Sequence, residues 1–137
     1  MSIKVQESIN NLEKRIISLK SAITKYHTKI GTDEEEDYLE LIIKRFESAD
    51  ETAKKLMQVY LEYLGERAPI GAKNLFIKMH EFALIDSDSW FNMNTDRNNT
   101  AHEYDERFVK ELADKVINIY LILIENFYIS LIEDFGQ

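Results

Sequence analysis

The stretch that decides the fold is the most apolar one in the chain, Val116 to Ile132, with the sequence VINIYLILIENFYISLI. From Ile117 onward it is apolar on more than one side when it is wound as a helix. Such a helix is either central in a domain or partly covered by another subunit. Polar residues interrupt the run, which favours a buried helix over a membrane span, so we expect no membrane contact. These interruptions are Asn118, Glu125, Asn126 and Ser130.

Upstream of this run, apolar residues recur at steps of three and four, the spacing of one apolar stripe on a helix. The first stripe covers residues 9–30 and should stop at Gly31. A second helix should begin near Asp33, where Thr32 and Glu35 resemble a capping box, and should end at Gly65. The spacing therefore predicts two long helices joined by a short turn.

The rest of the chain reads as two shorter helices and a long last one. Residues 65–71 hold the only proline between two glycines and form a loop. A third helix should cover residues 72–83, a short fourth should start near Trp90, and the last should start near Asp105. We predict an all-α, antiparallel up-and-down helical bundle. It has four main helices and one short helix, in a single domain over residues 1–137.

Composition narrows the classes of function. The chain has no cysteine, which excludes disulfides, thiolate metal sites and a cysteine nucleophile and fits the reducing cytoplasm. Its first residues have no apolar signal core, so we expect a cytoplasmic protein. The net charge is −8, whereas proteins that bind nucleic acid over their whole surface are usually basic. To bind nucleic acid, the chain would therefore need a local basic site or a basic partner. Alternatively, its acidic residues only keep it soluble.

The polar segment from Trp90 to Glu106, WFNMNTDRNNTAHEYDE, has a different character. Histidine is the side chain best suited to take and give a proton near neutral pH, and arginine binds phosphate oxygens with a planar fork. Arg97 and His102 together suit phosphodiester chemistry, in which histidine handles a proton and arginine stabilises charge on phosphorus. This pair demands no metal and no cofactor.

Spacing limits how these residues meet. Arg97 and His102 lie five positions apart, which places them about 140° apart on an ideal helix. Asn98 and His102 would share a face. We therefore predict a helix break within residues 98–100, because these residues are weak helix formers. A plain alternative stays open, in which Arg97 pairs with Asp96 or another nearby acid, His102 is an ordinary loop histidine and Tyr104 lies at the rim.

The whole run resembles the signature of the HEPN superfamily and, more narrowly, of the nucleotidyltransferase substrate-binding proteins. The residues that carry the resemblance are Trp90, Asp96-Arg97-Asn98, and His102-x-Tyr104-Asp105. The Pro69 loop, the residues 82–85 and the long apolar last helix also follow in the family's order, so the resemblance covers nearly the whole chain. Members are small helical bundles encoded beside a minimal nucleotidyltransferase.

This resemblance implies a metal-independent ribonuclease toxin that cleaves RNA. Its catalytic residues would be Arg97, Asn98 and His102, lining a cleft at a homodimer interface. The nucleotidyltransferase would be the antitoxin and would transfer AMP to Tyr104. Added phosphate there would bring negative charge beside the arginine and occupy the RNA phosphate site. Supporting or substrate-binding roles would fall to Trp90, Asp96 and Asp105.

The same family has a second interpretation, in which the bundle is the non-catalytic substrate-binding subunit of a two-component nucleotidyltransferase. A third is an interaction bundle with a degenerate site. Trp90 either stacks a base or anchors its helix to the core. The acidic run 33–37 lacks a calcium-loop pattern, so we expect no metal site there.

Overall fold

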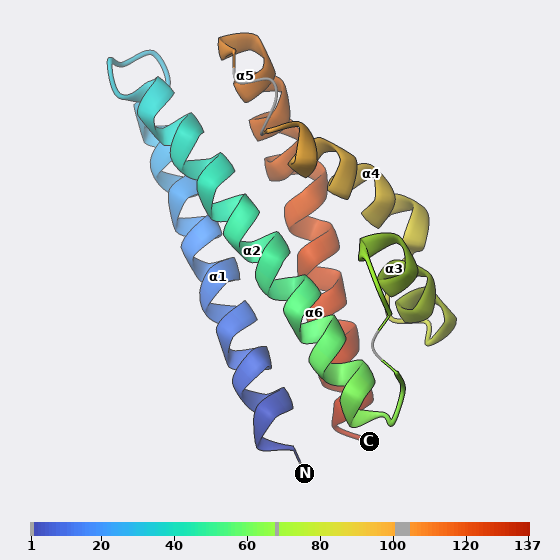
Figure 1. Ribbon diagram of the computed structural model, residues 1–137. Coiled ribbons are helices and arrows are strands. Elements are labelled where there is room, and N and C mark those ends of the chain that lie inside the picture. Colours follow the sequence, from blue (N-terminus) through green and yellow to red (C-terminus); the bar gives the residue numbers. More distant parts are fainter. Residues whose placement is uncertain (1, 68, 101–104) are drawn as a thin grey trace.

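The computed structural model describes residues 2–67, 69–100 and 105–137, and within these ranges the chain is helical apart from its turns (Figure 1). The last three helical segments follow one another without a gap and form one long helix. The segments are α1 (Ile3–Lys29), α2 (Glu35–Tyr63), α3 (Ala72–Glu81), α4 (Ser87–Asn99), α5 (Glu106–Lys115), the π-helical turn η1 (Val116–Tyr120) and α6 (Leu121–Phe135).

The helices run alternately in opposite directions. α1 and α2 form an antiparallel pair, α4 returns obliquely, and the α5–α6 helix runs back beside α2, so both chain ends lie at the same end of the molecule (Figure 1). α3 lies against α4 on the outer side. The predicted all-α bundle is confirmed. The short helix of the bundle was predicted to be the one that carries the polar segment. That helix, α4, has 13 residues and is longer than α3, which has 10.

The core is built from the predicted stripes of α1 and α2. All of the stripe between Ile9 and Tyr26 is buried, as is the α2 stripe between Ile42 and Tyr60. Removal of this apolar surface from water is the main stabilising contribution to such a fold. The predicted apolar stripes extended too far at their C-terminal ends, to Ile30 and Tyr63. Ile30 is 54% exposed and Tyr63 is 46% exposed. Each lies at the end of its helix, beyond the packed surface.

Three predicted helix boundaries were wrong. α4 begins at Ser87 and not near Trp90, because the Asp86 side chain caps the helix there. α2 begins at Glu35 and not near Asp33, because Thr32 forms a turn first and its hydroxyl accepts a hydrogen bond from the Glu34 backbone N–H. α3 ends at Glu81, so Ala83 lies outside it, with a positive φ of 59° that ends the helical path.

The π-helical turn η1 changes which side of the last helix is buried. Counted in steps of three and four from Val116, the apolar stripe of the last helix includes Ile119 and Leu123, so regular periodicity predicts both in the core. The wider turn instead continues the buried face from Val116 to Tyr120 and Ile124, and leaves Ile119 half exposed. Tyr120 stacks on Phe46 of α2 with the ring centroids 5.6 Å apart. The turn therefore brings a tyrosine hydroxyl into the middle of the bundle.

The last helix is buried on one face only. By length and composition, Glu106–Phe135 is long and apolar enough to cross a membrane, with a mean hydropathy of 1.6 over its most apolar window. Only 28% of that window is buried. The inner face packs through Ile124, Phe127 and Leu131, while Ile122 and Ile129 face outward. The prediction of a buried helix is thus correct for the inner face and wrong for the outer one.

Candidate functional site

The polar segment forms α4 and its C-terminal end. Asp86 caps the start, where its side chain accepts a hydrogen bond from the Ser89 backbone N–H. The helix ends at Asn99, and Thr100 is its C-cap, so the predicted break within residues 98–100 is confirmed. The last turn therefore presents Arg97 and the exposed Asn98 at the end of the helix. His102 and Tyr104 fall in residues 101–104, outside the described residues, and their predicted places stay predictions.

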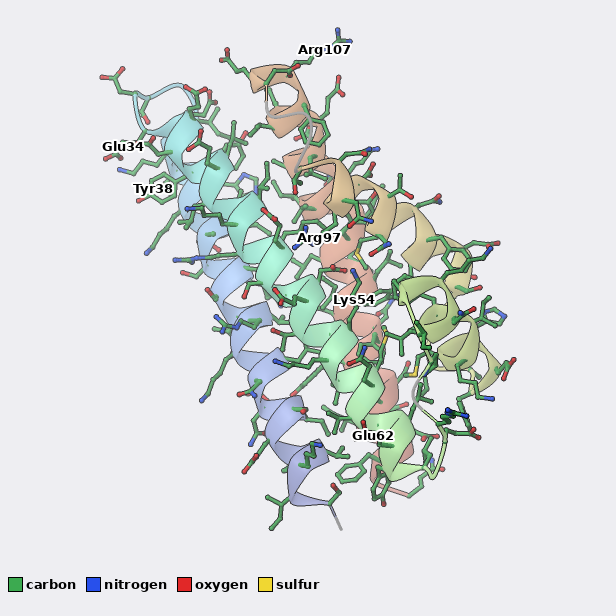
Figure 2. All side chains as sticks on the ribbon, viewed as in Figure 1. Glu34, Tyr38, Lys54, Glu62, Arg97 and Arg107 are labelled. Carbon is green, nitrogen blue, oxygen red and sulfur yellow. The ribbon has the colours of Figure 1, made fainter. Side chains whose placement is uncertain are left out.

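Arg97 points from α4 toward α2 (Figure 2). Its Nη1 lies 3.6 Å from the Glu47 carboxylate, and its Nε lies 3.8 Å from Oδ2 of Asp50. The Thr100 hydroxyl lies 3.3 Å from the same Glu47 oxygen. Arg97 therefore does not pair with its neighbour Asp96, but the alternative in which it pairs with another nearby acid is confirmed, because Glu47 and Asp50 of the facing helix lie beside it.

Asp50 is the buried centre of this contact. Its side chain is 1% exposed, and the Lys54 ammonium lies 2.8 Å from Oδ2. Within the described residues, neither carboxylate oxygen has a well-aligned hydrogen bond. Burial raises the pKa of Asp50, and the positive charges of Lys54 and Arg97 oppose that rise. The carboxylate therefore depends on its two cations for compensation.

Lys54 connects the same two helices. Besides Asp50, its ammonium donates a hydrogen bond to Oδ1 of Asn94 on α4, and it lies 6.0 Å from the centre of the Phe76 ring. Together these side chains form the α2–α4 cluster: Glu47, Asp50 and Lys54 from α2, and Asn94 and Arg97 from α4. With two carboxylates and two cations, the cluster is formally neutral.

Sequence reasoning missed Glu47, Asp50 and Lys54. A signal was present, because these residues are spaced by three and four and so form a polar stripe on the predicted second helix. The stripe lies directly beside the apolar one. What the spacing did not show was that this stripe faces α4.

Asp96 lies on a different side of α4, toward the last helix. The Tyr120 hydroxyl donates a hydrogen bond to its carboxylate, and Lys115 lies 3.1 Å away. Burial, and then the hydrogen bond to Asp96, raises the pKa of Tyr120. Asp96 therefore attaches α4 to the last helix while Arg97 attaches it to α2, so the end of α4 is fixed on both sides.

Trp90 and Asp105 have structural positions. The Trp90 ring is 1% exposed and packs against Phe76 and Phe127, with centroid distances of 5.6 and 5.7 Å. It anchors α4 to the core, and its buried faces leave no surface for a base to stack on. Asp105 is the N-cap of α5 and accepts a hydrogen bond of 2.8 Å from the Phe108 backbone N–H.

Metal ligands do not gather in the part of the chain that the structure describes, where no group of three or more histidine or acidic side chains is placed to hold an ion. His80 instead accepts a hydrogen bond from the Ser87 backbone N–H, at the start of α4. Near Arg97, the described residues offer paired charges and hydrogen-bond donors.

Comparison with known families identifies the family to which the chain belongs. Residues 7–133 match the family described as "Nucleotidyltransferase substrate binding protein like". The chain belongs to this family. The match runs from α1 into α6 and so includes every helix of the site. The family name implies a nucleotidyltransferase as the partner. A comparison with curated proteins gave no match.

Proposed function

We propose that this protein is a metal-independent ribonuclease toxin of a two-gene toxin–antitoxin pair, held in check by a minimal nucleotidyltransferase. The observation that carries the proposal is the fixed position of Arg97. It lies at the end of α4, held by Glu47 and Asp50, directly before the segment that contains His102. A preorganised cation and a histidine near it in the sequence supply two of the groups that metal-free phosphodiester cleavage can use.

The proposed chemistry uses one positive charge, one neutral donor and one proton acceptor. His102 takes the proton of the RNA 2′-hydroxyl, whose oxygen then attacks phosphorus. The bond from phosphorus to the 5′-oxygen breaks, that oxygen takes a proton from solvent water as it leaves, and His102 then returns its proton to solvent. Arg97 stabilises the negative charge on the phosphoryl oxygens, and Asn98 supplies a neutral donor beside it. Both residues come from the last turn of α4.

Two further elements belong to the proposal. The cleft forms between two copies of the chain, and the exposed isoleucines of the last helix supply an apolar surface for the contact. The partner transfers AMP to Tyr104, which adds a phosphate close to Arg97 in the sequence and blocks the RNA site. A mass increase of one or more AMP units with the partner and ATP, lost in Tyr104→Phe, tests this step. No mass change with an active partner contradicts it. RNA and partner would both be met in the cytoplasm.

A second candidate is the non-catalytic substrate-binding subunit of a two-component nucleotidyltransferase. Two observations favour it: the family description and the charge balance. The chain carries a net charge of −8, and the cations of the α2–α4 cluster are matched by acids. Such a surface suits docking to a basic enzyme better than unaided binding of RNA.

RNA cleavage by the purified, partner-free protein in EDTA separates the two candidates. We expect cleavage by the wild-type chain, its loss in His102→Ala, and its retention in His27→Ala, a matched change at an exposed histidine of α1. Mass spectrometry must first show that Tyr104 is unmodified. If folded, unmodified protein cleaves no RNA, the ribonuclease proposal fails and the substrate-binding subunit is favoured.

A further inference from the structure

We propose that Lys54 is a second phosphate-binding cation of the Arg97 site, so that the site spans α2 and α4 and is not confined to the motif. This inference rests on the proposed phosphate-handling role of Arg97 and extends it to a residue 43 positions earlier in the chain. Figure 2 shows the Lys54 and Arg97 side chains between α2 and α4. Lys54 lies outside the polar segment from Trp90 to Glu106, so the motif alone does not indicate it.

The two cations meet at one oxygen atom. Nζ of Lys54 lies 2.8 Å and Nε of Arg97 lies 3.8 Å from Oδ2 of Asp50. Like charges this close repel each other, and a carboxylate between them offsets the repulsion. The contact thus brings together two positive groups from different helices at one carboxylate oxygen.

The burial pattern directs the cations outward. The Asp50 side chain is 1% exposed, whereas Lys54 is 20% exposed and Arg97 is 28% exposed. The Asp50 charge therefore lies at the inner side of the cluster, and the two cations lie nearer to solvent, as does Glu47. A buried acid behind two partly exposed cations is a built arrangement, in contrast to the solvated pair of Arg107 and Glu111.

Hydrogen-bond donors remain for a ligand. Of the three donors on the Lys54 ammonium, one bonds Asn94 within the described residues, while Asp50 lies 2.8 Å away as an ion pair. Arg97 faces acids through Nε and Nη1, and its fork has further N–H groups. Because Oδ1 of Asn94 accepts from Lys54, the amide NH₂ of Asn94 is left as a neutral donor. Three donor groups from two helices suit the several oxygens of a phosphate.

Glu47 sets the limit on affinity. Its carboxylate lies 3.6 Å from Arg97 and competes with any anion for the guanidinium. An incoming phosphate would replace this contact, while Asp50 stays in place beneath. We therefore expect modest affinity for a free phosphate group, and a ligand that adds contacts elsewhere.

The phosphate belongs either to a nucleotide or to an RNA backbone, and two probes distinguish them. The first is ATP, and the second is a single-stranded 2′-O-methyl oligoribonucleotide, which lacks the nucleophile and cannot be cleaved. Dissociation constants are measured for the wild-type chain, Lys54→Gln, Lys54→Arg and Lys55→Gln. Lys55 is the matched control, because it is the exposed neighbour on the same helix and its loss changes the net charge equally.

We expect Lys54→Gln to weaken binding of the preferred probe about tenfold, the scale of one charge-assisted hydrogen bond. Lys54→Arg should retain most of the affinity, and Lys55→Gln should change it less than about twofold. If Lys54→Gln and Lys55→Gln weakened probe binding equally, the loss would come from the change in net charge and not from a contact of Lys54. That result would overturn the assignment. Wild-type affinity in a folded Lys54→Gln protein would overturn it too.

A measurement on the unaltered protein covers the case in which Lys54→Gln does not fold. In lysine-selective NMR spectra of the wild-type chain, the preferred probe should shift the Lys54 ε-methylene signal and leave that of Lys55 in place. An unmoved Lys54 signal at saturation, or no binding of either probe, contradicts the inference. Because both probes report binding without cleavage, the inference can fail while the ribonuclease proposal stands, and the reverse.

Discussion

Asp50 shows how one residue determines the character of the site. A carboxylate removed from water is costly unless cations or donors compensate for the loss of solvation. Here Lys54 and Arg97 provide that compensation from two helices. Loss of either cation would leave a buried acid with one partner fewer. The same contact therefore connects the stability of the α2–α4 packing to the position of Arg97.

The raised pKa of Asp50 makes a prediction about stability and pH. A carboxyl group whose pKa is higher in the folded state stabilises the fold most below its unfolded pKa, and that contribution is lost as pH rises through the folded pKa. Asp50→Asn should therefore cost more unfolding free energy near pH 4 than near pH 7. Urea unfolding of both proteins at the two pH values measures the difference.

Asp86→Asn provides a control of opposite sign. The Ser89 hydroxyl donates a hydrogen bond that lowers the pKa of Asp86, so its contribution is present above the ordinary pKa and lost as pH falls. The cost of Asp86→Asn should therefore grow with pH. If the cost of Asp50→Asn also grew with pH, the attraction of the two cations would outweigh burial, and our account of Asp50 would be wrong.

Among single residues, the sequence drew attention to Arg97 but did not predict its partners. An arginine beside a histidine-containing run is visible as a pattern. The acids that hold it come from α2 and meet it only because the chain returns through α3 and α4. Contacts of this kind depend on the rotation of two helices about their axes, which local spacing does not determine.

Among the helices, α4 depends most on side-chain contacts to its neighbours. It is mostly polar, and its two buried residues are Trp90 and Met93. Its end is tied to α2 by Arg97 and to the last helix by the hydrogen bond from Tyr120 to Asp96. The π-helical turn η1 contains that tyrosine and so links an irregular turn to the position of the motif.

Removal of the Tyr120 hydroxyl should loosen α4. Tyr120→Phe leaves Asp96 with Lys115 as its remaining partner among the described residues, and should cost about 1 kcal/mol, the usual value for one hydrogen bond. Amide hydrogen exchange should become faster in α4 while that of α1 changes little. Exchange measured by mass spectrometry for each helix tests this expectation.

Tyr128→Phe is the matched control for that experiment. The Tyr128 hydroxyl also donates to a carboxylate, at 2.6 Å from Glu13, but this bond joins α6 to α1. Its loss should leave exchange in α4 unchanged. If both variants changed α4 equally, or if Tyr120→Phe left it unaltered, the hydrogen bond to Asp96 would not be what fixes the helix.

Helices with a strong apolar period were predictable, and the irregular turn was not. Steps of three and four residues predicted α1 and α2 because their buried faces are continuous. The same rule predicted Ile119 in the core and failed there. A π-helical turn widens the helix locally without a proline or glycine to mark it, since residues 116–120 read VINIY. Tertiary packing of Tyr120 against Phe46 decides that turn.

For the whole molecule, charge and apolar surface point to partners. The net charge of −8 disfavours unaided binding of a long RNA, so any nuclease activity should be sensitive to salt. The outer side of the last helix has the opposite character. Ile119, Ile122 and Ile129 are each about half exposed and spaced to lie on one side of that helix. Exposed apolar side chains gathered on one face are typical of a contact surface.

The last prediction concerns this face. We expect the protein to form a homodimer through the exposed isoleucines, with a solution mass about twice the 16.1 kDa of one chain. Ile122→Glu should give monomers, because each copy would place a carboxylate in an apolar contact, where an unpaired charge is costly. Ile70→Glu is the matched control, since Ile70 is 90% exposed in the loop before α3.

Light scattering after size-exclusion chromatography at micromolar concentration measures the mass of all three proteins. A wild-type monomer would remove the dimer from the proposed function. A dimer that Ile122→Glu leaves intact would move the contact to another face. If Ile122→Glu alone gives monomers, RNA cleavage by that variant tests the cleft directly. If the site is shared between two copies, the monomeric variant should be inactive even though its Arg97 and His102 are unchanged.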